Sequence, residues 1–191
     1  MTTQRERELR YLVAKAGGRV VRAETRTTGR VERPGLELEF RDNPNAVQFL
    51  NGLARLDSTY EPFLTLGAKF VETQRRQNLT RLALACKVHD FCKTILRYQP
   101  ESEETFRSPA ITLSMGAGDC DEHAVLLVTL ALASGLEAEC VGVSIRPGQG
   151  ISHVCATAEG YWAETTIDAR FGEHPIAAAK RLGILRSDLG T

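Results

Sequence analysis

The sequence predicts an α+β fold, and three stretches of the 191-residue chain support that prediction. Residues 60–98 carry apolar side chains at helical spacing, and residues 124–132 are apolar on nearly every side, so both stretches are expected to be helices. Residues 151–157 and 161–168 are rich in apolar, β-branched and aromatic types and flank Glu159-Gly160, a pattern typical of a β-hairpin.

The first 75 residues are expected to form an N-terminal elaboration that carries no recognisable chemical motif. Residues 4–16 predict a short charged helix, and the alternation in Val20-Val21 and residues 36–40 predicts a small β-ribbon after it. Asn43-Pro44-Asn45 predicts the start of a helix that runs to about residue 56, because proline is favoured in a first helical turn.

The helical stretch at residues 60–98 is expected to serve as a scaffold, with a break near Gln77-Asn78. His89 and Cys92 in this stretch are three residues apart, a spacing that two metal ligands can have. On an apolar helical stripe such residues are more often part of the core, and we interpret them so. The acidic run at residues 101–104 is interpreted as a solvated loop or helix cap.

Cys120 is the candidate nucleophile. Asp119 is a strong N-cap type and follows Gly118, so Cys120 is expected in the first turn of the apolar helix, where free N–H groups and the helix dipole favour a thiolate. Such surroundings can lower a thiol pKa from about 8.5 to roughly 3.5–7.5. Asp121 and Glu122 oppose that shift, so the hypothesis requires His153 beside Cys120 as a compensating cation.

The hairpin places a candidate base and two candidate acids on one face. If Glu159-Gly160 forms the turn, Cys155 lies opposite Glu164 and His153 opposite Thr166. Glu164 and Asp168 are then both diagonal to His153, about 7–8 Å away by backbone and within side-chain reach. A carboxylate there fixes the imidazole tautomer and leaves the other ring nitrogen facing the thiol.

The strand before this hairpin is expected at residues 139–145, with Cys140 as a small core residue. Ser134-Gly135 ends the apolar helix ahead of it. The loop at residues 146–150 lies next to the proposed site, and loops in such positions commonly shape substrate access.

Six stretches resemble the short bacterial and phage-borne members of the transglutaminase-like superfamily, a papain-related group, and the resemblance as a whole extends over about half of the chain. Its core pattern is Gly-x-Cys at a helix start, a histidine that opens a strand, and an acid on the next strand. The stretches are Arg97-Tyr98, Phe106-Arg107-Ser108-Pro109-Ala110, Gly118-Asp119-Cys120-Asp121-Glu122-His123-Ala124, Ser134-Gly135, Ser152-His153-Val154 and Trp162-Ala163-Glu164-Thr165-Thr166.

The resemblance implies that Cys120 is the nucleophile, His153 the base and Glu164 the acid. The family usually has aspartate before a small residue and threonine, whereas this chain has Glu164-Thr165-Thr166, so Asp168 stays as the alternative acid. The implied fold is a papain-like transglutaminase core at residues 76–191, in one compact unit with the elaboration at residues 1–75.

The implied activity is thiol-dependent acyl transfer on a peptide-like amide, with hydrolysis favoured over transamidation. The expected partner is a peptide or protein substrate, and no cofactor or metal is expected. The Cys120 N–H is a natural oxyanion donor, and the segment near Tyr98 is the candidate source of a second donor.

Two alternatives come from other functional classes. Cys120, His123, His153 and Cys155 are zinc-ligand types, and if they converged they would form a structural metal site that consumes both nucleophile and base. The other alternative is a catalytically silent module that binds a peptide or a virion component, because a scaffold can persist after its site is lost.

The composition of the chain bears on its partners and its cellular location. Lys plus Arg equals Asp plus Glu at 24 each, so no charge bias favours nucleic acid or an anionic membrane as a partner. We expect no signal peptide or membrane span, because the chain starts with polar residues and lacks a run of about 18 apolar residues. Five cysteines, an odd number without framework spacing, favour a reducing, cytoplasmic location.

Overall fold

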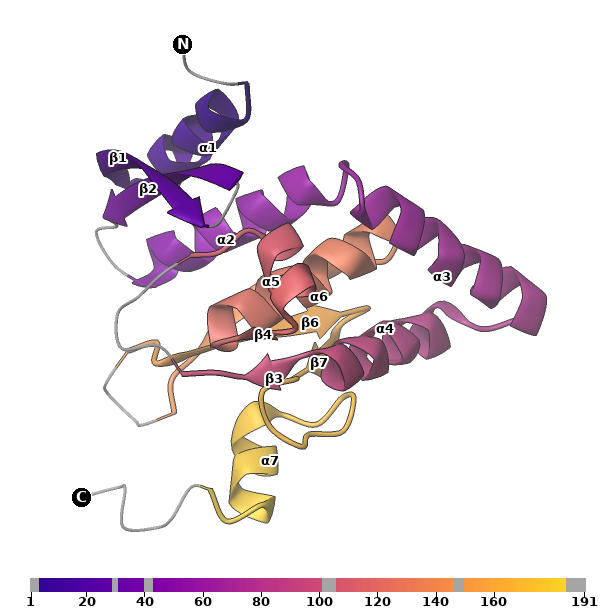
Figure 1. The fold of residues 1–191 in the computed structure, drawn as a ribbon. Coiled ribbons are helices and arrows are strands. Elements are labelled where there is room, and N and C mark those ends of the chain that lie inside the picture. Colours follow the sequence, from indigo (N-terminus) through magenta and orange to yellow (C-terminus); the bar gives the residue numbers. More distant parts are fainter. Residues whose placement is uncertain (1–3, 29–30, 40–42, 101–105, 146–149, 185–191) are drawn as a thin grey trace.

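The structure is a computed structural model that describes residues 4–28, 31–39, 43–100, 106–145 and 150–184, with the backbone alone for 21–28 and 31–39 (Figure 1). The α+β prediction is confirmed, because helices combine with small sheets. The helices are α1 (Gln4–Lys15), α2 (Asn43–Asp57), α3 (Phe63–Gln77), α4 (Arg81–Ile95), α5 (Pro109–Met115), α6 (Cys120–Ala133) and α7 (Pro175–Arg181). The strands are β1 (Arg19–Thr28), β2 (Val31–Glu39), β3 (Arg97–Tyr98), β4 (Ala117–Gly118), β5 (Ala138–Val143), β6 (His153–Ala158) and β7 (Tyr161–Ala163).

Helix α6 lies at the centre of the fold. Every residue from 121 to 131 is buried, as a helix that is apolar on nearly all sides requires. Helices α2, α3, α4 and α5 pack against it, and the antiparallel sheet β5-β6-β7 packs against it as well (Figure 1). Gly67 permits the close approach of α3, because a Cβ atom there would lie only 2.2 Å from the carbonyl oxygen of Ala133.

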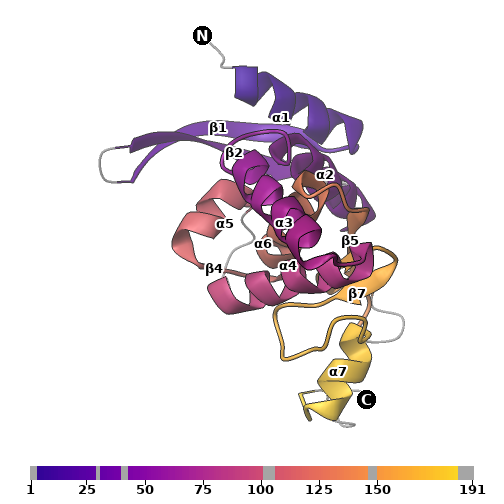
Figure 2. The same ribbon diagram turned by 90° about the vertical axis from the view of Figure 1, so that its right-hand side faces the viewer.

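The N-terminal elements follow the prediction closely. Strands β1 and β2 form the expected antiparallel ribbon, which reaches out beyond the helices around α6 (Figure 2). The helical stretch breaks where Asn78 adopts the left-handed conformation after α3, and Thr80 then caps α4. The predicted boundary near residue 75 falls within α3, and the division into elaboration and core stays a prediction.

The β6–β7 hairpin has the predicted register, but β7 is shorter than predicted. The pairs Ala158–Tyr161 and Thr157–Trp162 form as expected, and the ladder ends at the pair Ala156–Ala163. The predicted pairing of Cys155 with Glu164 and of His153 with Thr166 is therefore wrong as a description of the ladder. The backbone turns away after Ala163 because the Glu164 carboxylate accepts the backbone N–H of Thr166 two residues later.

Two predicted loops lie partly or wholly outside the described residues, namely 101–104 and 146–149 of the loop before β6. Within the described part of the chain, no helix combines the length and the apolar character that crossing a membrane requires.

Asn51 joins the N-terminal helices to the sheet. Its side-chain oxygen accepts the backbone N–H of Cys140 at 2.7 Å, and its side-chain nitrogen donates to the carbonyl oxygen of Cys140 at 2.9 Å. The amide thus takes the place of a neighbouring strand along the edge strand β5, where unpaired backbone groups would otherwise lie against α2.

We predict that Asn51→Ala lowers the free energy of unfolding by about 1–3 kcal/mol, because it leaves one backbone donor and one acceptor unsatisfied. Gln48→Ala, on the exposed side of the same helix, should change stability by no more than about 0.5 kcal/mol. Urea denaturation of both variants measures the difference, and equal stability of the two would contradict the role given to Asn51.

Candidate active site

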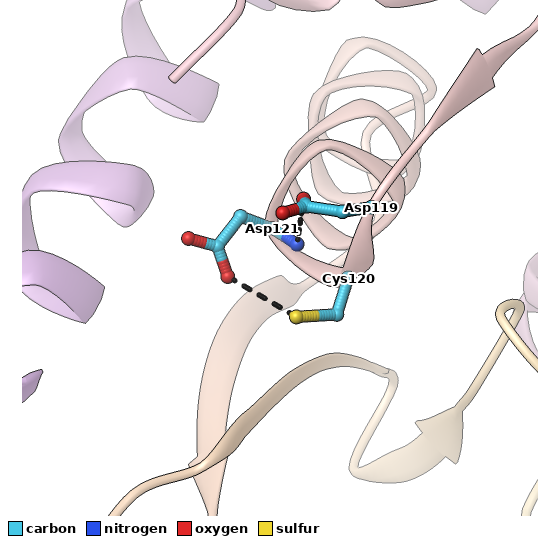
Figure 3. Close-up of side chains that lie close together, drawn as sticks. All are labelled: Asp119, Cys120 and Asp121. Carbon is cyan, nitrogen blue, oxygen red and sulfur yellow. Dashed lines mark hydrogen bonds between the residues drawn. The ribbon is translucent and has the colours of Figure 1, made fainter. Parts of the chain in front are cut away.

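Cys120 is the first residue of α6, as predicted, and its position is fixed by a capping box. Asp119 Oδ1 accepts the backbone N–H group of Asp121 at 3.0 Å (Figure 3). It also accepts the N–H of Glu122 at 3.4 Å, and Glu122 Oε2 accepts the N–H of Asp119 at 2.8 Å. Gly118 makes room for this cap, because a Cβ atom there would lie 2.7 Å from the Cβ of Glu122. None of the described hydrogen bonds uses the backbone N–H of Cys120.

The expected lowering of the Cys120 pKa is wrong for the structure as it stands. Burial raises the pKa of this half-buried thiol, and the negative charge of Asp121 raises it further. A hydrogen bond from the backbone of Val154, the residue after His153, acts in the opposite direction and places the sulfur against the start of β6. A helix terminus is worth about 0.3–1 kcal/mol at an exposed site, whereas desolvating a charge costs several kcal/mol, so burial outweighs the dipole.

His153 and Glu164 form a hydrogen-bonded pair, as their shared hairpin face predicts. Nε2 of His153 lies 2.6 Å from Oε2 of Glu164. Because a carboxylate only accepts, Nε2 carries the hydrogen, and in a neutral ring Nδ1 is then the free base. Among the residues that the structure describes, none forms a hydrogen bond with Nδ1.

The Glu164 carboxylate is ionised in spite of its burial. Its side chain is 1% exposed, which by itself raises its pKa. The hydrogen bond to His153 and the two that Oε1 accepts from Thr166, from N at 2.6 Å and from Oγ1 at 2.7 Å, outweigh burial and bring the pKa below 4.5. Three donors therefore hold this carboxylate as an anion facing the imidazole.

Two buried histidines bind the chain just after the end of the β6–β7 ladder, one at the backbone of Glu164 and the other at the side chain of Thr165. Nε2 of His89, on α4, donates to the carbonyl oxygen of Glu164 at 2.8 Å. Nδ1 of His123, on α6, lies 3.1 Å from Oγ1 of Thr165. The core interpretation of His89 and Cys92 is confirmed by their burial, but the supporting roles of His89 and His123 were missed. In the sequence, the signal for these roles was that each histidine is a polar residue on an otherwise apolar helical face.

Asp168 lies away from the site. Its side chain is 84% exposed and accepts a hydrogen bond from Lys93 Nζ at 2.8 Å, which lowers its pKa. Cys155 does lie near Glu164, whose charge adds to burial in raising the Cys155 pKa. Its thiol donates to the carbonyl oxygen of Val141 at 3.7 Å, so it is engaged with the sheet.

The structure does not gather the four residues of the zinc hypothesis. Across the described ranges, the cluster of His, Cys, Asp or Glu ligand atoms lying within 4.8 Å of one another is Asp119, Cys120 and Asp121. His123, His153 and Cys155 each point to a separate partner instead. Asp119 already accepts two backbone N–H groups, so the helix cap accounts for its position.

Tyr98 borders the site from β3. It is half exposed, and its pKa is raised by burial and then by the charges of Cys120, Asp119 and Glu164, which places the phenol within electrostatic reach of the nucleophile. The backbone N–H groups of Arg97 and Gln99 donate to the carbonyl oxygens of Gly116, just before β4, and of Gly118 on β4. These two backbone N–H groups are therefore engaged, and the phenol is the side chain of this segment that lies within electrostatic reach of Cys120.

A cavity of about 520 Å³ opens elsewhere, between α4 and the segment that follows β7. His89, Lys93, Asp168 and Arg181 are among its lining residues, whereas Cys120, His153 and Glu164 are not. Its charged groups are largely engaged with one another and with neighbours, as in the pairs Lys93–Asp168 and Arg181–Glu173. This cavity is therefore separate from the predicted site residues at the start of α6 and after β7.

Comparison with known proteins agrees with the geometry. The sequence model of the transglutaminase-like superfamily matches residues 68–171, more than half of the chain and the part that carries Cys120, His153 and Glu164. The chain therefore belongs to the transglutaminase-like superfamily, which includes cysteine-dependent enzymes. No curated protein and no solved structure matches the chain.

The lowered pKa of Glu164 predicts a pH-dependent contribution to stability. A carboxyl group whose pKa is lower in the folded than in the unfolded protein stabilises the fold above its unfolded value, and that stabilisation disappears as pH falls through the folded value. The difference in free energy of unfolding between the wild type and Glu164→Gln should thus be full at pH 6–7 and shrink below about pH 4.5.

Thr166→Val removes one of the three hydrogen bonds to Glu164 but keeps the charge of the carboxylate. Its difference from the wild type in free energy of unfolding should therefore be smaller and should depend on pH in the same way. Urea denaturation from pH 3 to pH 7 measures all three proteins. A Glu164→Gln difference that does not vary with pH would contradict the ionised, hydrogen-bonded state.

Proposed function

We propose that this protein is a cysteine-dependent acyl-transfer enzyme with a papain-like arrangement, in which Cys120 attacks the carbonyl carbon of a peptide-like amide. His153 acts as general base, and Glu164 orients its ring. The observation that carries the proposal is the 2.6 Å contact between His153 Nε2 and Glu164, which leaves Nδ1 as the basic nitrogen beside the strand residue that hydrogen-bonds the Cys120 sulfur.

The raised pKa of Cys120 defines the first step. The thiol is protonated at neutral pH, so His153 Nδ1 removes the proton as sulfur attacks, rather than holding a preformed ion pair. The S–C bond forms while the carbonyl π bond opens to an oxyanion. When the tetrahedral intermediate collapses, the imidazolium gives that proton to the leaving amine and a thioester remains.

The oxyanion has two donors near it in this scheme. The backbone N–H of Cys120 lies at the helix start, where the dipole favours a negative charge. The Tyr98 hydroxyl is the second donor we propose, because the charge of Cys120 reaches it.

Water is the acyl acceptor that we favour, since no sequence feature selects a lysine acceptor. His153 would then remove a proton from water, and hydrolysis of the thioester would release the acid and regenerate the thiol. A peptide or protein is the substrate class that follows from this chemistry, and the five free cysteines suit the reducing cytoplasm proposed for the protein.

One observation favours a second candidate, a catalytically silent binding module for a peptide or virion component. The Cys120 pKa is raised rather than lowered, which a protein without selection for a reactive thiol can tolerate. The two candidates differ in whether Cys120 forms an acyl-enzyme at all.

A generic acyl donor tests this difference without knowledge of the substrate. p-Nitrophenyl acetate should acetylate Cys120, with a burst of nitrophenol and an acetyl group mapped to this residue by mass spectrometry, and Cys120→Ala should abolish both. Glu164→Gln should slow acetylation by roughly 10²- to 10⁴-fold, because the imidazole loses its fixed tautomer. Asp168→Asn, a matched isosteric change at an exposed carboxylate, should leave the rate near that of the wild type.

Added methylamine separates the two acyl acceptors, because N-methylacetamide in excess of the amount formed with Cys120→Ala, which measures direct attack of the amine on the ester, forms only if an amine competes with water for the acyl-enzyme. Acetylation spread over several cysteines, or unchanged in Glu164→Gln, would favour the silent module. Loss of rate in Asp168→Asn alone would assign the acid to Asp168.

A further inference from the structure

The Cys120 thiol is engaged with a carboxylate that the proposed reaction does not use. Sγ of Cys120 lies 3.5 Å from Oδ1 of Asp121, and Asp121 is 6% exposed although it carries a carboxylate (Figure 3). The same carboxylate raises the pKa of the buried Cys140 thiol on β5, so its charge reaches the sheet as well as Cys120.

A thiol has a single hydrogen, so it can donate a hydrogen bond to one acceptor at a time. While the hydrogen points to Asp121, it cannot be donated to His153 Nδ1. The general base is therefore not in contact with the proton that it must remove. A thiolate formed in this position would also face a carboxylate at hydrogen-bond distance, within a partly desolvated site where charges interact strongly.

The other charged and titratable groups around the sulfur do not take over this role. Asp119 and Tyr98 also lie within electrostatic reach of Cys120, but Asp119 is engaged as the helix cap. From β6, His153 is the cation when protonated, and it is held by Glu164. Asp121 is the acidic group whose side chain hydrogen-bonds the sulfur itself.

We propose that Asp121 is a positioning residue that holds the Cys120 thiol hydrogen away from His153 in the resting protein, so that the nucleophile becomes reactive only when this hydrogen bond breaks. This role rests on the proposed function of Cys120 as the nucleophile. It keeps the resting thiol slow toward oxidants and adventitious electrophiles, and rotation about the Cα–Cβ bond or the C–S bond that turns the S–H toward Nδ1 is the activating step.

The test is the pH profile of Cys120 alkylation by iodoacetamide, followed by mass-spectrometric mapping between pH 5 and pH 11. Asp121→Asn keeps the shape of the side chain and removes its charge. Each unit by which the thiol pKa falls gives tenfold more thiolate at neutral pH. The thiolate is then also less basic, and its intrinsic rate constant for alkylation falls about 3-fold. We therefore expect alkylation at pH 7 to rise about 3-fold for each unit by which the pKa falls, which is about 3-fold to 10-fold for a fall of one to two units.

Three further variants keep the experiment interpretable. Asp168→Asn removes an exposed carboxylate by the same chemical change and should leave the Cys120 profile in place. Asp121→Ser, with a residue well suited to the start of a helix, should shift the profile in the same direction if the asparagine variant folds poorly. Cys120→Ser confirms which labelled peptide reports the nucleophile.

An unchanged profile in both Asp121 variants, or slower labelling at pH 7, would overturn the proposal. An equal rise in labelling of the buried Cys92 would overturn it as well, because that result indicates a loosened fold rather than a released Cys120 thiol. Labelling does not require turnover, so this test is separate from the acetylation experiment, and either can fail while the other succeeds.

Discussion

The burial of α6 on every side is the constraint from which the site follows. A helix that is buried over residues 121–131 cannot leave its first N–H groups to water, so its own sequence must supply their acceptors. Asp119 and Glu122 do this, and Gly118 gives them room. The cap fixes Cys120 at the first helical position, and the same burial that fixes it makes a thiolate costly.

That cost explains the form of the rest of the site. In the proposed mechanism, a nucleophile that rests as a thiol needs a base with a fixed tautomer, and the base needs an anion that stays ionised away from water. Glu164 meets this need with three hydrogen bonds from His153 and Thr166. The end of the ladder at Ala163 frees the backbone for the turn to Thr166, and His89 then holds the carbonyl group that the ladder no longer pairs.

Much of this could be predicted from local sequence, and the remainder depended on tertiary contacts. Asp119 before an apolar run predicts the helix start at Cys120, and Glu159-Gly160 predicts the hairpin register, because both signals act over a few residues. The short β7 and the outward direction of Asp168 depend on the turn at Glu164 and on Lys93, which lies 75 residues away in sequence. The raised pKa of Cys120 likewise depends on burial by distant elements, and the sequence carries no direct measure of it.

The most direct test of the account is a crystal structure of the protein with an acyl group or a ketone inhibitor attached to Cys120. The account predicts that Nδ1 of His153 faces the modified sulfur while Nε2 still bonds Glu164. It also predicts that the former carbonyl oxygen lies about 2.7–3.1 Å from the Cys120 N–H and near the Tyr98 hydroxyl. An adduct whose oxygen points away from the start of α6, or an imidazole that has left Glu164, would contradict it.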